Sequence, residues 1–235
     1  AIPRPVSLTP VQTSAGSTID GPTTSTAYRI TATALAALTD TPADSRAGVA
    51  TNHTIAFTTA GATAVNDTIE ITFPDGFAIA SNASVTSASG LITSYSAVAV
   101  AGQKVTLTVG AAASAGASTV SVTGITNSGI AATHTMYVAQ ITANPANANS
   151  RSATVGVTSN ALSKLLALAP GETKAAATTT GKAAGLTPTS QTAGSAFNIT
   201  VYGVDAYFNT TSATDTVSLA TSAPAAPSPW RVAPP

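Results

Sequence analysis

The chain has 235 residues, of which 44% are hydrophobic, 5% aromatic and 8% charged, and its formal net charge is zero. Its nine basic residues are scattered singly, so it lacks the positive surface that nucleic-acid binding requires, and that class of function is excluded. The absence of cysteine excludes disulfides and thiolate metal sites, and no apolar run is long enough for a membrane-spanning helix.

Residues 1–26 are predicted to form an extended arm. This segment contains four prolines among Ser, Thr and Gly residues. Proline fixes φ and has no N–H to donate, so the segment is poorly suited to a strand inside a sheet. A disordered tail is the alternative. The chain begins with Ala1, as it would after removal of a signal peptide, and a shortened chain would begin in the same way.

Residues 27–159 are predicted to form a β-sandwich. In NDTIEITFPDGF, apolar residues alternate with polar ones, and Pro-Asp-Gly then supplies a turn. Short strands of this kind, separated by Gly, Asn and Ser, are typical of two antiparallel sheets packed face to face. The apolar positions with a two-residue period are Ile55 and Phe57; Ile69, Ile71 and Phe73; Val105, Leu107 and Val109; Val120 and Val122; Val155 and Val157.

Residues 160–235 are predicted to form a partial second sandwich with a proline-rich tail. The segment LSKLLALAPGE fits a short helix or a strand, and we favour the strand. The closing APAAPSPWRVAPP is too rich in proline for a central strand. Alternation predicts two further strands, one with Phe197, Ile199 and Val201 on one face and one with Val217 and Leu219.

Two parts of the chain resemble modules of large bacterial and archaeal surface proteins. Residues 30–158 contain TIAFTT, ITFPDGF, VTLTV and VTGITN in the order found in β-sandwich repeats of surface-layer and adhesin proteins. Residues 166–219, through AGSAFNITVYGVDAYFN, resemble bacterial immunoglobulin-like repeats of the invasin and intimin kind. In those repeats this segment forms two strands and a turn, and Phe208 stands where they often carry Gly. The resemblance implies an all-β chain of tandem immunoglobulin-like sandwiches.

The second module is incomplete in this sequence. Immunoglobulin-like repeats continue with about three more strands, which are missing here, and an open sandwich exposes apolar faces and unpaired edges. Two hypotheses follow: the native polypeptide continues beyond Pro235, or a strand from another molecule completes the sheet. In the second case, the arm and the TSTAYRITATALAAL segment at its boundary are the candidate donor strand.

The sequence contains no recognisable catalytic constellation, and we expect no enzymatic activity. Gly181-Lys182 lacks the rest of a phosphate-binding Walker motif. His53 and His134 each open a predicted strand, where a polar role at the strand edge is favoured over a metal site that has no third ligand. Lys104 and Glu70 are expected on solvent-facing sides of their strands rather than in a buried isopeptide.

Three residues are weak candidates for calcium ligands, and calcium is the one cofactor considered. Asp205, Asn209 and Asp215 supply the oxygen atoms that this ion prefers. We favour the alternative that these side chains stabilise a turn by bonding to its backbone. Asp40 and Asp44 present the same choice. Candidate glycosylation sites in Asn-x-Ser/Thr sequons are Asn52, Asn66, Asn82, Asn198 and Asn209.

These features predict a structural subunit of an extracellular cell-surface assembly, either a fibre or a surface layer. Copies of the secreted chain would form a homopolymer through β-strand contacts. The alternative is an adhesin or carbohydrate-binding module that binds surface glycans through loops. Its ligand-binding residues would be the aromatic side chains Tyr207 and Phe208, with Tyr202 and Trp230 as further candidates.

Overall fold

The computed structural model describes residues 35–59, 61–90, 92, 94–141, 149–212, 214 and 216–218, together with the short strands β1 (Thr13–Ser14) and β2 (Ser17–Thr18). Within these residues every regular element is a β-strand and all pairings between strands are antiparallel, which confirms the all-β prediction. No helix of the described part could cross a membrane. The rest of the predicted arm and the proline-rich tail lie outside the described residues.

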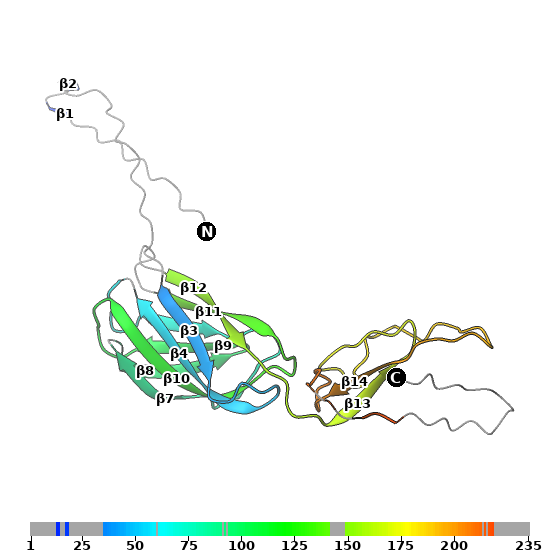
Figure 1. Cartoon of the computed structure of the whole chain (residues 1–235). Coiled ribbons are helices and arrows are strands. Elements are labelled where there is room, and N and C mark those ends of the chain that lie inside the picture. Colours follow the sequence, from blue (N-terminus) through cyan, green and yellow to red (C-terminus); the bar gives the residue numbers. More distant parts are fainter. Residues whose placement is uncertain are drawn as a thin grey trace.

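Two five-stranded sheets pack face to face and form a body that we call the sandwich (Figure 1). One sheet has the order β3-β4-β10-β6, and β7 also pairs with β10. Its strands are β3 (Ala36–Pro42), β4 (Ala50–Thr59), β10 (Gly116–Thr126), β6 (Ala78–Ile79) and β7 (Val85–Gly90). The other sheet contains, in spatial order, β12 (Asn149–Gly156), β11 (Thr133–Ile141), β5 (Thr68–Thr72), β9 (Lys104–Val109) and β8 (Tyr95–Ala101).

The alternating apolar residues of both sheets meet in one core. On β9 the burial alternates with the sequence, so that Val105, Leu107 and Val109 are fully buried and the threonines between them are half-buried. All the apolar positions predicted from the two-residue period in the sandwich are buried in this core. The prediction of these strands is therefore confirmed, because a strand that is buried on one face repeats every two residues.

The second unit, residues 160–212, follows the sandwich and contains a single two-stranded sheet. Its strands are β13 (Lys164–Leu168) and β14 (Thr200–Val204). The strand favoured for LSKLLALAPGE is thus confirmed. The core of this unit is small: Leu166, Leu168 and Val204 are buried, with Tyr202 and Phe208 packed against them.

The predicted strand through Phe197 and Ile199 begins later than expected. β14 starts at Thr200, and both Phe197 and Ile199 are 45% exposed. The reason is that β13 ends at Leu168, where Pro170 and Gly171 turn the chain away, so residues 197–199 have no neighbouring strand to pair with. The strand predicted around Val217 is also wrong for the described residues, since Val217 is 44% exposed outside any strand.

Candidate functional site

A tight turn after β14 forms hydrogen bonds that hold the second unit against the sandwich. The side chain of Asp205 stabilises this turn. Both oxygens of this fully buried carboxylate accept two hydrogen bonds each. Oδ1 accepts the backbone N–H groups of Tyr207 and Asn209, each at 2.9 Å. Oδ2 accepts the backbone N–H of Asn160 at 2.9 Å and the Asn209 side-chain amide at 3.0 Å. One carboxylate therefore fixes the turn and the start of the second unit together.

The electrostatics of Asp205 follow from these donors. Burial alone would raise the pKa of its carboxyl group. Hydrogen bonds from the Asn209 side chain and from the backbone N–H groups of Asn160, Asn209 and Tyr207 outweigh burial and lower this pKa below its usual range. The turn thus holds an ionised carboxylate by hydrogen bonds, and none of the ion pairs found among the described residues includes Asp205.

Two asparagine side chains form hydrogen bonds with backbone groups in loops of the sandwich. The Asn209 side chain accepts the N–H of Ala131 at 2.8 Å and donates to the carbonyl of Gly129 at 2.9 Å. From the start of the second unit, Asn160 Nδ2 donates to the carbonyl of Ala47 at 2.9 Å. We call these contacts and those of Tyr207 the junction. Because its side chains bond to backbone groups of two loops, it fixes the orientation of the second unit on the sandwich.

Tyr207 packs against two glycines of the sandwich loops, Gly48 and Gly129. Its ring lies where a Cβ atom at Gly48 would stand, and it also lies against Gly129. Its hydroxyl donates a long hydrogen bond of 3.4 Å to the carbonyl of Gly48. Gly48 has a φ of 68°, so glycine meets two needs here, a left-handed backbone and room for the ring.

Phe208, the next residue, has a φ of 65°. This conformation is unfavourable for a bulky residue, whereas glycine adopts it without strain. Packing compensates for it: the ring fills the space beside Gly181, and the Lys164 ammonium lies 3.7 Å from its centroid. Both aromatic residues proposed as ligand-binding groups are thus engaged in contacts within the protein.

A buried histidine supports the sandwich side of the junction. His53 on β4 is fully buried, with Nδ1 at 2.9 and 3.0 Å from the two carboxylate oxygens of Asp40. Its Nε2 lies 3.0 Å from Asn127 Oδ1. The strand-edge role predicted for His53 is therefore wrong, because β3 and β10 pair with both edges of β4 and residue 53 faces the core.

The hydrogen bonds of Asn127 define the orientation of its side-chain amide toward His53. Asn127 Nδ2 donates to the carbonyls of Asp44 at 2.7 Å and Arg46 at 2.9 Å, so its Oδ1 must face His53. The imidazole ring is therefore held between the Asp40 carboxylate on its Nδ1 side and Asn127 Oδ1 on its Nε2 side. This arrangement holds residues 44–46, which lead directly into Ala47 and Gly48 of the junction.

The predicted calcium ligands are placed as turn residues. Asp205 and Asn209 lie together, but N–H donors occupy both carboxylate oxygens of Asp205, so neither oxygen is free for a cation. Asp215 lies outside the described residues. Asp44 accepts the N–H of Arg46 and pairs with its guanidinium, which lowers the pKa of Asp44 to about 2. In the described part of the chain, no group of three or more acidic or histidine side chains is placed to hold a metal ion.

The remaining candidates lie on the surface, with one exception. His134 bonds through Nε2 to the carbonyl of Ile130 at 3.0 Å. Lys104 and Glu70 form a partly exposed ion pair of 2.7 Å, as expected for solvent-facing positions. Asn209 is 3% exposed, and its amide is engaged in the junction, so the folded protein offers this sequon no access for glycan transfer. The other four sequon asparagines are exposed: Asn52, Asn66, Asn82 and Asn198.

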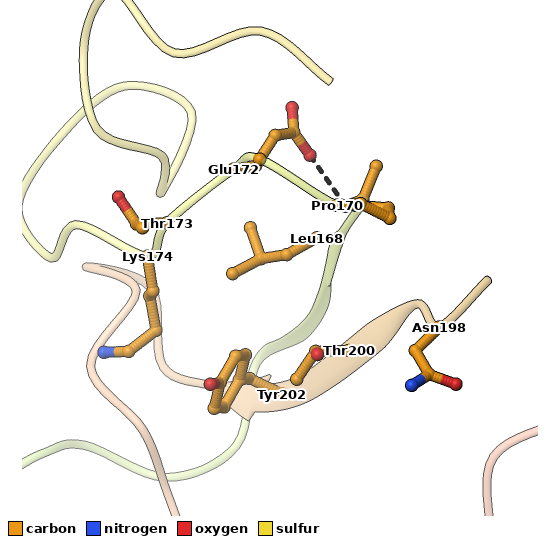
Figure 2. Close-up of a pocket in the computed structure, with 10 residues that line it drawn as sticks. Leu168, Pro170, Glu172, Thr173, Lys174, Asn198, Thr200 and Tyr202 are labelled. Atoms are coloured by element: carbon orange, nitrogen blue, oxygen red, sulfur yellow. Dashed lines mark hydrogen bonds between the residues drawn. The ribbon is translucent and has the colours of Figure 1, made fainter. Parts of the chain in front are cut away.

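A pocket of about 290 Å³ lies in the second unit between the end of β13, the following turn and β14. Figure 2 shows Leu168, Lys174 and Tyr202 around this space, with Asn198 at one end. Glu172 shapes the turn: its carboxylate accepts the N–H of Ala169 at 2.9 Å and pairs with Lys182 at 2.6 Å. The hydrogen bond from Lys182 lowers the pKa of Glu172.

Comparison with known proteins assigns no family to the chain. No protein-family model matches it, and neither does any of the curated proteins. Among solved structures, the crystal structure of BslA, a bacterial hydrophobin, is similar at 16% sequence identity with a TM-score of 0.35. The similarity covers 53% of this chain and 98% of the BslA chain. At so low a TM-score we draw neither fold nor function from it.

The glycine at position 48 gives a direct test of the junction. Gly48→Ala is expected to displace Tyr207 and to lower stability more than Gly102→Ala, because Gly102 has a similar φ of 58° but open space around it. Left-handed backbone strain costs both variants about 1–2 kcal/mol. Urea unfolding followed by tyrosine fluorescence measures the difference, and equal losses in the two variants would show that Tyr207 does not depend on Gly48.

The lowered pKa of Asp205 predicts a pH dependence of the junction. Its stabilisation is complete above the ordinary carboxyl pKa of about 3.9 and is lost as the pH falls through the lower pKa of the folded state. Asp205→Asn should therefore be less stable than the parent at pH 7, with a smaller gap in strongly acidic solution. Urea unfolding at several pH values measures this gap, and a gap that does not change with pH would contradict the assignment.

Proposed function

We propose that the chain is a structural subunit of an extracellular cell-surface assembly, built from tandem immunoglobulin-like units and joined to further copies through strand contacts of the second unit. The observation that carries this proposal is a sheet with one buried face and one exposed apolar face that no described strand covers. The junction adds to it, because a fixed orientation of the second unit suits a regular fibre or layer.

The register of β13 and β14 defines the two faces. Leu165 lies opposite Gly203 and Ala167 opposite Val201, so these residues share one face. Leu165 is 53% exposed and Ala167 is exposed, whereas Leu166 and Leu168 on the other face are buried. Phe197 and Ile199 continue the two-residue spacing from Val201, and both are 45% exposed. We call these five residues the bare face: Leu165, Ala167, Phe197, Ile199 and Val201.

The edges of this sheet are also open. Among the described residues, β13 has no strand partner except β14. The far edge of β14 is bonded at its end, where Thr211 N donates to the carbonyl of Gly203 and Thr210 bridges Val204. Along the earlier part of β14, the far edge has no strand partner among the described residues. A strand added at either edge would pair with free backbone groups and extend the sheet.

Energetics favour a further partner for this unit. A two-stranded sheet is marginal in water, and three buried apolar residues make a small core. Exposed leucine, isoleucine and phenylalanine on a contiguous face are characteristic of an interaction surface. Because the chain has no net charge, copies approach one another without strong electrostatic repulsion. These properties support association between copies through the bare face.

A pair of charges on the bare face tests this function. The double variant Leu165→Arg, Ile199→Arg should remain folded yet lose concentration-dependent association, because burying unpaired guanidinium groups at a contact is costly. Leu186→Arg is the matched control, since Leu186 is 45% exposed in the connection between the two strands and lies off the sheet. Sedimentation velocity over a range of concentrations measures association. Association that survives in the double variant would contradict the proposal.

The pocket of the second unit supports an adhesin or carbohydrate-binding function as the alternative. It combines the Tyr202 ring with the polar side chains of Lys174, Asn198 and Thr200. Glycan-array binding that is lost in Tyr202→Ala and kept in Tyr207→Ala would place a sugar site in the pocket. Absence of glycan binding by the parent protein would argue against this alternative.

A further inference from the structure

The strand β8 forms an edge of the sandwich, and its ladder has one register shift, between Tyr95 and Ala97. It pairs with β9, and in the described part of the chain no strand lies on its other side. Its sequence, YSAVAVA, contains no charge, no proline and no glycine. Natural proteins commonly block sheet edges with charged residues or proline, or cover them, because free N–H and C=O groups pair readily with another chain.

The opposite side of the sandwich is closed. There β3 lies beside β12, and Arg151 on β12 donates to the carbonyl of Leu35 at 3.4 Å. Just beyond these strands, Thr158 exchanges backbone hydrogen bonds of 2.8 Å with Ser45 and Ala47. On the β8 side, β7 pairs with β10 in the other sheet and forms no ladder with β8. Among the described strands, β7 and β8 are therefore packed together less closely than β3 and β12.

Val98 shows what this opening exposes. Val98 lies opposite Leu107 and Val100 opposite Val105, so both valines face the core side of the sheet. Leu107 and Val105 are fully buried, whereas Val98 is 37% exposed. The core face is thus incompletely covered at its last strand. Pairing along this edge would cover Val98 as well as satisfy the backbone.

We propose that β8 pairs antiparallel with β8 of a second copy, with Val98 of each copy at the two-fold axis. The five-stranded sheet that ends in β8 would then continue into the same sheet of the second copy. This register sets the two Val98 side chains against each other and places Ala97 opposite Ala99. Ser96 meets Val100, and the register shift between Tyr95 and Ala97 leaves Tyr95 outside this regular pairing, so no charge and no pair of bulky side chains opposes the contact.

The second copy fits this edge better than a charged or bulky partner. A strand without charges gains nothing from an acidic or basic peptide, and its outward residues, Ala97, Ala99 and Ala101, offer no pocket that would select large side chains. An edge of seven residues is a smaller contact than a standard stable interface. The pair is therefore weak by itself and is strengthened when a second contact raises the effective concentration.

Because the protein contains no cysteine, single cysteine substitutions test the register directly. Val98→Cys should form a disulfide-linked dimer under mild oxidation, with a yield that rises with protein concentration, since the two positions lie opposite each other. Val100→Cys is the matched control on the same face. In the proposed register its two copies stand about 13 Å apart along the strands, which is too far for a disulfide. Far-UV circular dichroism of the reduced variants verifies folding.

The outcomes separate this proposal from the proposed function. A Val98 disulfide that also forms in the Leu165→Arg, Ile199→Arg background supports the β8 pair independently of the bare face. A disulfide in Val100→Cys but not in Val98→Cys overturns the register. A disulfide that forms only in mixtures of Val98→Cys with Leu165→Cys shows that β13 occupies the edge and overturns the proposal. Absence of all these disulfides at high concentration overturns it as well.

Discussion

The arrangement of the two units depends on the ionised carboxylate of Asp205. Four N–H groups converge on it, from the turn itself and from the start of the second unit. Without this group, the turn would leave those donors buried and unpaired, which is costly in a protein interior. Asn209, which the carboxylate positions, then reaches the backbone of Gly129 and Ala131. One polar cluster thus determines how a small sheet is presented on a large sandwich.

The sandwich contributes a matching rigid surface. His53 and Asp40 occupy its core, where Phe73 and Phe77 pack edge-on against the imidazole ring. Asn127 connects His53 to the loop that leads into Ala47 and Gly48, because its amide contacts the imidazole and donates to the backbone carbonyls of residues 44 and 46. Breaking a buried pair of this kind is strongly destabilising, because it leaves one polar partner uncompensated. The protein therefore places buried polar interactions on both sides of the junction, while the bare face of the β13–β14 sheet is exposed and no other described strand pairs with this sheet.

Local patterns predicted the strands because burial on one face of a sheet repeats every two residues. The turn at Asp205 and Asn209 was recognisable because its residue types suit a turn. Gly48, Gly129 and Asn160 were not predicted, since their role arises from contacts between distant parts of the chain. His53 was misplaced although the signal was present: it has the same parity as Ile55 and Phe57, which places it on the buried face. Alternation likewise predicted the face of Ile199, but it does not reveal whether a second sheet covers that face.

Hydrogen–deuterium exchange of β13 and β14 as a function of protein concentration tests the central claim most directly. If other copies cover the bare face, exchange of the Leu165 and Val201 amides should slow as concentration rises. The buried Leu107 amide in the sandwich should exchange slowly at every concentration. Rapid exchange in β13 and β14 at all concentrations would contradict the account. Protection that does not depend on concentration would also contradict it, because the covering segment would then belong to the same chain.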